Sequence, residues 1–228
     1  MHRSVKMELL KDALGWLKTI LFAFIFAWLL TNFVIVNALV PTGSMQETIR
    51  VNDRIVAFRL SYLFSEPQRS DIIVFRSRDY VSVSFLQRIT STFSNRIGDG
   101  QTLYVKRIIG VPGDTIYIYD WRVFLNGAEE PLIEDYVLAP GRPGHQHRMF
   151  PILESYPLNS YITVPEDGSS PFVTVPDGHF FVLGDHRNNS VDSRSWGAAD
   201  TLRTFVPQEH IQGRVIFRYF PGFRNLTR

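Results

Sequence analysis

The hydrophobic and polar positions divide the chain into two parts with different patterns. No residue between Thr19 and Gln46 is charged, and residues 19–40 form a nearly continuous apolar run. As a helix with a rise of about 1.5 Å per residue, this run would be roughly 33 Å long, enough to cross the hydrocarbon core of a bilayer. It therefore predicts a transmembrane helix over 19–40. A buried helix of a soluble protein and a cleaved signal peptide are alternatives, although the apolar core of a signal peptide is shorter.

The charges around the apolar run predict how it would be oriented. Residues 1–18 carry more basic than acidic side chains: Arg3, Lys6, Lys11 and Lys18 against Glu8 and Asp12. Basic residues next to a span stay on the cytoplasmic side. We expect residues 1–18 to be cytoplasmic and residues 41–228 to lie on the far side of the membrane. No later segment has 18 uncharged apolar residues in a row, so a single pass is predicted.

After residue 40 the pattern changes to short runs rich in Val, Ile, Phe and Tyr, separated by turn residues. Such runs are typical of strands. Asn-Gly at 126–127 is a hairpin signal, and no βαβ alternation is visible. The fold class predicted is mainly β, with an antiparallel β-sheet domain. The expected strands cover 53–58, 71–76, 104–111, 114–119, 122–127, 172–178, 179–185 and 213–220.

Two segments depart from the strand pattern. Residues 77–103 contain a helical stripe of apolar positions and form an insert that would either pack on the β core or lie on a membrane surface. Residues 128–171 are rich in Pro and Gly and are predicted to form a smaller outer β lobe with long loops. The expected organisation is therefore a basic N-terminus, one span, and an extracytoplasmic domain over 41–228 that contains both segments.

Composition excludes several functions. The chain has 24 basic and 22 acidic residues, a balance that shows no nucleic-acid footprint. It has no cysteine, which excludes disulfides, Cys-ligated zinc and a thiol nucleophile. His145 and His147 could ligate a metal, but no third ligand keeps regular spacing with them, and a solvated loop is favoured. Asn188 and Asn225 begin glycosylation-type triplets, for which we expect no role.

Ser44 is the candidate nucleophile, and two bases could serve it. Asp185 and His186 would complete a Ser/His/Asp set. However, neighbouring residues on a strand point to opposite faces, so these two could not easily bond each other and face Ser44 together. Lys106 is the alternative, because a lysine can act as a base when burial lowers its pKa.

The surroundings of Lys106 leave its exposure open. Composition alone favours an exposed lysine. Alternation along the strand, however, places Tyr104, Lys106 and Ile108 on one face, with Arg107 on the other. Lys106 therefore shares its face with two large apolar groups, which is the environment that a desolvated base needs.

Four stretches resemble, in order, the conserved boxes of type I signal peptidases. They are "PTGSMQETI" (41–49), "RSDIIVFR" (69–76), "YVKRIIGVPGD" (104–114) and "GDHRNNSVDSRSWG" (184–197), and they follow an apolar N-terminal helix as in that family. The resemblance implies a membrane-anchored serine endopeptidase that removes N-terminal signal peptides from exported preproteins.

The resemblance also implies roles for individual residues. Ser44 would be the nucleophile and Lys106 the general base. The backbone N–H of Ser44 and the hydroxyl of Thr42 would form the oxyanion hole, and Ser190 would orient the amine of Lys106. The residues expected to support the site are Gly43, Met45, Tyr104, Arg107, Asp185, Asp192 and Arg194.

The family likeness further implies a location and partners. The enzyme would lie in the cell membrane, act on preproteins, contact membrane lipid, work as a monomer and need no metal or cofactor. Two other functions are open. The same chemistry could serve one dedicated secretion or transfer-system substrate, or the chain could be a tethered β-rich binding module, which would leave the four stretches unexplained.

The chain departs from the family pattern at several positions. Thr42 replaces a common Ser but keeps a hydroxyl, and Glu47 replaces the usual Pro. Ile49 stands for Leu, His186 for Asn and Asn188 for Asp. The changes at 47 and 49 bear on the rigidity of the serine loop rather than on its chemistry.

Overall fold

The computed structural model describes residues 2–77, 103–119, 122–137, 162–163, 172–196 and 201–227. The helices are α1 (His2–Leu29), the π-helix η1 (Leu30–Val34), α3 (Ser193–Trp196), and the 3₁₀ turns η2 (Arg59–Tyr62), η3 (Arg187–Asn189), η4 (Thr201–Thr204) and η5 (Gln208–His210). The strands are β1 (Ile35–Leu39), β2 (Arg54–Phe58), β3 (Ile72–Arg76), β4 (Leu103–Gly110), β5 (Thr115–Tyr119), β6 (Arg122–Leu125), β7 (Ile162–Thr163), β8 (Phe172–Thr174), β9 (His179–Leu183), β10 (Val206–Pro207), β11 (Ile211–Phe220) and β12 (Arg224–Asn225).

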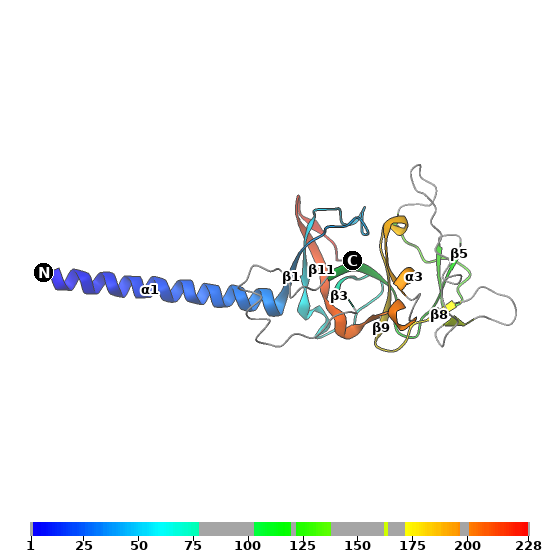
Figure 1. The fold of residues 1–228 in the computed structure, drawn as a ribbon, viewed down its shortest axis with the longest axis horizontal. Coiled ribbons are helices and arrows are strands. Elements are labelled where there is room, and N and C mark those ends of the chain that lie inside the picture. Colours follow the sequence, from blue (N-terminus) through cyan, green and yellow to red (C-terminus); the bar gives the residue numbers. More distant parts are fainter. Residues whose placement is uncertain are drawn as a thin grey trace.

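These strands form two antiparallel sheets. The larger has eight strands in the order β1-β2-β11-β3-β4-β9-β10, with β12 paired to β11. The smaller has four, in the order β6-β5-β8-β7. In Figure 1, α1 projects from one end of the molecule, and β5 and β8 lie at the opposite end. The predicted mainly β, antiparallel fold class is confirmed.

All eight predicted strands are present, with boundaries that differ by a few residues. Four strands were not predicted. Three of them, β7, β10 and β12, are only two residues long and too short to show a period. The Asn126–Gly127 pair does form a turn, with φ values of 56° and 72°. That turn ends β6.

The fourth unpredicted strand corrects the predicted helix over 19–40. The helix begins at His2, and helical structure ends at Val34. Residues 35–39 form β1, which pairs with β2 from Ile35↔Phe58 to Leu39↔Arg54. Val36 and Val40 are buried in the core of the large sheet. The end of the apolar run is hydrophobic because it belongs to this core.

Two polar residues near the end of the helix are satisfied by the helix itself. Thr31 donates from Oγ1 to the carbonyl of Ala27 at 2.9 Å, and Asn32 donates from Nδ2 to Trp28 at 2.8 Å. Bonds of this kind compete with the backbone ladder, and they coincide here with the wider π-helical turn. The described residues contain one helix long and apolar enough to cross a membrane, Lys11–Val34, with a mean hydropathy of 1.9.

The large sheet is packed by two apolar clusters, and a third joins it to the small sheet. One cluster combines β1, β2 and β3 with Met45, Ile49 and Leu226. The second lies on β3, β4, β9 and β10 and includes Ile73 and Ile108. The third joins Ile116 and Val173 of the small sheet to residues of β4 and β9. The loop that carries Ser44 is thus anchored in the first cluster.

Most of the two predicted embellishments falls outside the described residues. This applies to 78–102 of the insert and to 138–161 and 164–171 of the outer lobe, including His145 and His147. The described parts of the lobe are residues 128–137 and β7.

Candidate active site

Ser44 lies in the connection between β1 and β2, on a loop closed by its own backbone. Gln46 donates to the carbonyl of Gly43 at 3.1 Å, and Ile49 donates to that of Met45 at 2.7 Å. Met45 and Ile49 are fully buried and fix the loop to the core. Ser44 itself is 8% exposed. The loop therefore presents a nearly buried hydroxyl from a well-anchored backbone.

Lys106 comes from the middle of β4 and meets Ser44 across the site. Its Nζ donates to Ser44 Oγ at 2.7 Å. Lys106 pairs with Ile73 of β3 and is only 3% exposed. Ile73 and Ile108 belong to the same apolar cluster, against which Tyr104 also packs. The expectation of an exposed lysine, drawn from composition, is wrong, because the apolar face of the strand decides its environment.

Burial changes the acidity of this lysine. Desolvation lowers the pKa of Lys106 from its ordinary value of 10.5 to about 8, while the nearby Asp192 and Asp185 carboxylates oppose the change. A buried ammonium loses the hydration that stabilises its charge. Lys106 is therefore neutral over a range in which an exposed lysine remains charged.

The predicted oxyanion-hole groups both belong to the serine loop. Thr42 is exposed, two residues before Ser44. Among the residues that the structure describes, none accepts a hydrogen bond from the Ser44 N–H. Because Gly43 has no Cβ, the side chains of Gln46 and Asn189 can lie close to its backbone. A Cβ there would lie 3.1 Å from Gln46 Oε1 and 3.2 Å from Asn189 Nδ2.

Residues 184–186, which directly follow β9, contact the serine loop. The N–H of His186 donates to the carbonyl of Ser44 at 3.0 Å, and its ring Nδ1 lies 3.3 Å from the carbonyl oxygen of Gly43. Asp185 instead accepts from Thr48 at 2.5 Å and from Arg107. Asp185, His186 and Ser44 thus do not assemble as a catalytic triad.

Two buried ion pairs flank the lysine. Arg107 holds Asp185 through Nε at 2.8 Å and Nη2 at 2.6 Å. Arg194 holds Asp192 through Nε and Nη2, both at 2.9 Å. Burial by itself would raise the pKa of Asp192, but Arg194 and the N–H of Gly184 outweigh it and keep this pKa below its ordinary value. The Asp192 carboxylate therefore stays ionised close to Lys106.

Ser190 is half-buried and makes no hydrogen bond to Lys106. Its buried Oγ has no hydrogen-bond partner among the described residues. It nevertheless lies near enough to Asp192 to contribute to the low pKa of that carboxyl. The hydroxyl and this carboxylate are therefore polar neighbours rather than a hydrogen-bonded pair.

The structure adds residues that the sequence did not indicate. Arg107 stacks over the ring of Tyr136 at 3.8 Å, and the Tyr136 hydroxyl donates to Glu134 at 3.0 Å. Glu134 also pairs with Arg187. Thr48 and Arg187 stand inside the four matching stretches, but 134–136 carry no motif, so only the tertiary structure shows that they contact the site.

The Arg107–Asp185 pair supports a stability prediction. Arg107→Met should lower the free energy of unfolding by about 3–5 kcal/mol, because it leaves a buried carboxylate uncompensated. Arg107→Met combined with Asp185→Leu should recover most of this loss. Denaturant unfolding of the full chain in detergent measures both. Equal instability of the single and double variants would contradict an electrostatic origin.

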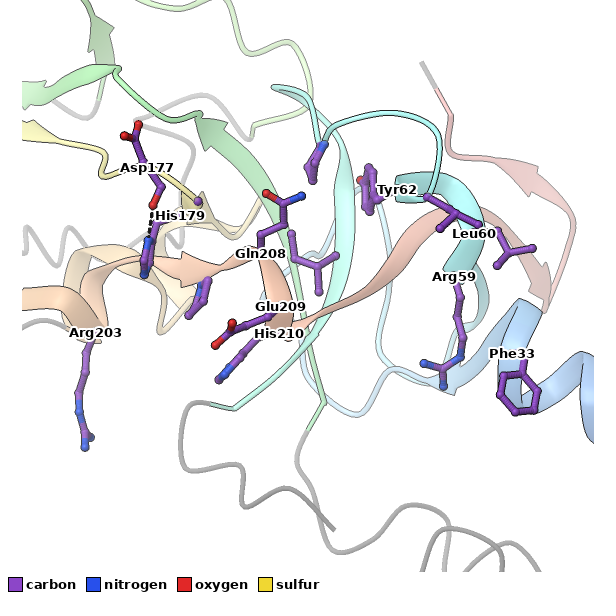
Figure 2. Close-up of a pocket in the computed structure, with 15 residues that line it drawn as sticks. Phe33, Arg59, Leu60, Tyr62, Asp177, His179, Arg203, Gln208, Glu209 and His210 are labelled. Atoms are coloured by element: carbon purple, nitrogen blue, oxygen red, sulfur yellow. Dashed lines mark hydrogen bonds between the residues drawn. The ribbon is translucent and has the colours of Figure 1, made fainter. Parts of the chain in front are cut away.

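A large cavity lies elsewhere. It has a volume of about 1130 Å³ and lies between Phe33 and Arg59 at one end and His179 and Arg203 at the other (Figure 2). A large cavity is usually a candidate for a binding site. Here neither Ser44 nor Lys106 lines it, so we place the active site at their hydrogen bond. Among the described residues no cluster of three or more His, Cys, Asp or Glu could hold a metal.

Comparison with known proteins gives a consistent set of relatives. A family model described as signal peptidase, peptidase S26, matches residues 13–220. A probable signal peptidase I-1 of Synechocystis sp. is 35% identical over 202 residues, 89% of this chain and 80% of the relative. A signal peptidase I of Leptolyngbya laminosa is 33% identical, covering 90% of this chain and 78% of its own. A crystal structure of a signal peptidase I from Enterococcus faecalis aligns with 66% of this chain and 97% of its own, at 29% identity and a TM-score of 0.38.

Proposed function

The chain belongs to the signal peptidase family, peptidase S26, and we propose that it removes signal peptides with Ser44 as nucleophile and Lys106 as general base. As a member of this family it is a serine peptidase, a hydrolase. The observation that supports the residue assignment best is the buried 2.7 Å contact between Lys106 Nζ and Ser44 Oγ. A neutral amine at this distance can accept the hydroxyl proton directly.

The proposed reaction has two half-reactions. Ser44 Oγ attacks the scissile carbonyl carbon while its proton passes to Lys106 Nζ. The tetrahedral intermediate collapses, the peptide C–N bond breaks, and the new amine of the mature protein takes the proton from Lys106. The signal peptide remains as an ester on Ser44. Lys106 then deprotonates a water that attacks this ester, the bond between the acyl carbon and Ser44 Oγ breaks, and Lys106 returns the proton to Ser44 as the signal peptide leaves as a carboxylic acid.

The oxyanion of each tetrahedral intermediate would be stabilised by the Ser44 N–H and the Thr42 hydroxyl. The N–H has no acceptor among the described residues, and Thr42 lies on the exposed side of the same loop. Donors that are already fixed in place stabilise a developing charge without reorganising at the moment of reaction. We assign Ser190 to orienting the Lys106 amine, since its buried hydroxyl has no hydrogen-bond partner among the described residues and lies near Asp192, whose charge acts on Lys106.

The membrane helix would place this chemistry at the bilayer surface. We propose a single pass in the cell membrane with residues 1–18 in the cytoplasm, following the excess of basic residues before the span. Ser44 follows Val34 by ten positions, and β1 occupies most of that interval. A preprotein held by its own apolar signal would therefore meet the nucleophile near the membrane. The enzyme would act as a monomer and contact lipid through α1.

The direct test uses the full chain in detergent with a panel of preproteins. N-terminal sequencing of the product should show cleavage after a small residue, and an acylating probe should add its mass at Ser44. Labelling of Ser44 with cleavage of only one preprotein would favour a dedicated peptidase instead. Absence of both labelling and cleavage in a folded sample would favour the binding module.

The lowered pKa of Lys106 predicts the pH dependence of the reaction. Because only the neutral amine accepts a proton, kcat/KM should rise about tenfold per pH unit below pH about 8 and level off above it. Initial rates between pH 6 and 10, with a check that the enzyme survives each buffer, measure this. A profile that is flat from pH 6 to 9 would exclude Lys106 as the base.

A further inference from the structure

The end of the chain returns to the serine loop. Strand β12 pairs with β11 in the register Phe217↔Asn225 and Arg218↔Arg224. One residue later, the N–H of Leu226 donates to the carbonyl of Ile216 at 2.9 Å. These bonds hold residues 224–227, which we name the C-terminal tail, against the large sheet. The C-terminal tail is thus held in place by backbone hydrogen bonds to β11.

The C-terminal tail shares a core with the serine loop. The side chain of Leu226 is 9% exposed and belongs to the same apolar cluster as Met45 and Ile49. Met45 follows the nucleophile directly. A residue more than 170 positions away in the sequence therefore packs in the cluster that anchors Ser44.

Arg224 adds a polar contact to this packing. Its Nη1 donates to the carbonyl of Glu47 at 3.2 Å and to that of Thr48 at 3.4 Å. A planar guanidinium can bridge two neighbouring carbonyls in this way, whereas an ammonium presents a point charge. Thr48 in turn donates to Asp185 at 2.5 Å. The far half of the serine loop is thus held on one side by Arg224 and on the other by the ion pair beside Lys106.

The backbone conformation of Glu47 needs contacts that hold it in place. Glu47 has a φ of 85°, in the left-handed region that residues with a Cβ rarely adopt. Proline, the usual residue of the family pattern here, is locked near a φ of about −65° and could not take this conformation. An unfavourable backbone conformation persists only where the surroundings hold it.

Side-chain packing does not supply that support on the outer side of the loop. A cavity of about 340 Å³ lies there, lined by residues that include Glu47, Thr48, Arg107, Arg224 and Leu226. Among the described residues, the hydrogen bonds from Arg224 are the ones that the carbonyls of Glu47 and Thr48 accept.

We infer that Arg224 is a positioning residue for the nucleophile, holding Glu47 in its left-handed conformation and so setting the direction of Ser44 Oγ toward Lys106. The inference rests on the proposed role of Ser44. Arg224 contacts neither Ser44 nor Lys106 and acts through the carbonyls of Glu47 and Thr48. It should therefore influence the rate of acylation more than substrate binding or the acidity of the base.

The test compares Arg224→Gln with Arg224→Lys and with Arg122→Gln, a control at an exposed arginine on the other sheet. Arg224→Gln should lower kcat by roughly tenfold, because small displacements of a nucleophile are costly. KM and the pH midpoint should stay unchanged. Arg224→Lys should retain part of the activity, and Arg122→Gln all of it. The rate of Ser44 labelling by an acylating probe should fall in parallel with kcat.

A second variant separates positioning from simple stabilisation. Glycine adopts the left-handed region freely, so Glu47→Gly in the Arg224→Gln background should recover most of the lost kcat. Wild-type kcat in Arg224→Gln, or a loss that matches the fall in folded protein, would overturn the inference. Ser44→Ala assayed in parallel distinguishes a failure of the proposed function from a failure of the role given to Arg224. Full cleavage by Ser44→Ala would refute the proposed function, whereas a dead Ser44→Ala beside a fully active Arg224→Gln would refute only the role of Arg224.

Discussion

Replacing Lys106 by methionine is expected to abolish cleavage and, at the same time, to stabilise the fold. Methionine fills nearly the same volume in the apolar cluster beside Ile73 and Ile108 but cannot accept a proton. Without its base, Ser44 is a weak nucleophile, and kcat should fall by a factor of roughly 10³ or more. A lysine that served only the structure would show the opposite result, since its loss would weaken the fold.

The gain in stability follows from the depressed pKa. The difference between 10.5 and about 8 corresponds to roughly 3 kcal/mol of disfavoured charge in the folded state. About 1 kcal/mol is offset by the lost hydrogen bond to Ser44, so the net gain at pH 7 should be about 2 kcal/mol. Between pH 8 and 10.5 the unfolded state binds the extra proton, so the stability of the wild type rises with pH. The advantage of the variant should shrink across that window.

Unfolding of both proteins in detergent between pH 7 and 10.5, beside Ser44→Ala, measures these effects. Ser44→Ala should be equally inactive but should gain no stability, because Lys106 stays buried. If Lys106→Met kept more than a tenth of the wild-type activity at neutral pH, the base would have to be sought elsewhere, first at His186. If it lost stability, the desolvation argument would be wrong.

The sequence predicts the parts of the molecule that depend on local pattern. Alternating apolar runs identify eight strands because a strand that is half buried shows its period in the sequence. The same reasoning failed at β1, where both the membrane helix and the sheet core require apolar residues, so Ile35–Leu39 could not be told from the preceding helix. What separates them is the pairing with β2, a tertiary contact.

In the active site, too, the sequence predicts the residues but not the tertiary contacts between them. The matching stretches place Ser44 and Lys106 in the chain, but their 2.7 Å contact joins residues 62 positions apart. The burial of Lys106 depends on what covers its strand, so composition could not predict it. Tyr136 contacts Arg107 and Glu134 pairs with Arg187, both from a loop without any motif. Their sequence offers no signal, because side chains of many kinds could occupy such positions.

Gly184→Ala is the second change expected to have a large effect, through geometry alone. A Cβ at this position would lie 2.4 Å from the carbonyl oxygen of Ser44 and 2.2 Å from Ser190 Oγ. Real Cβ contacts do not occur at such distances, and a backbone carbonyl cannot rotate away as a side chain can. The 3.0 Å bond from the His186 N–H to the same carbonyl would have to lengthen or break.

The serine loop and residues 184–190 must therefore separate, and the nucleophile moves with the loop. We expect kcat/KM to fall at least about 100-fold, because a displacement near 1 Å is enough to lose that much. The cost in stability should be smaller, about 1–3 kcal/mol, as for other overpacked sites. Gly15→Ala, which adds the same methyl group in open space on α1, is the matched control and should leave activity unchanged.

The rate of Ser44 acylation by a probe, set against the melting temperature, separates the two consequences of the added methyl group. A large fall in the acylation rate with a modest fall in melting temperature would show that Gly184 is required for the approach of two segments at the nucleophile. Wild-type acylation by Gly184→Ala would show that the loop yields without disturbing Ser44. In that case the close contact at Gly184 would not set the geometry of the hydroxyl, and the bonds within the loop from Gly43 to Ile49 would have to do so.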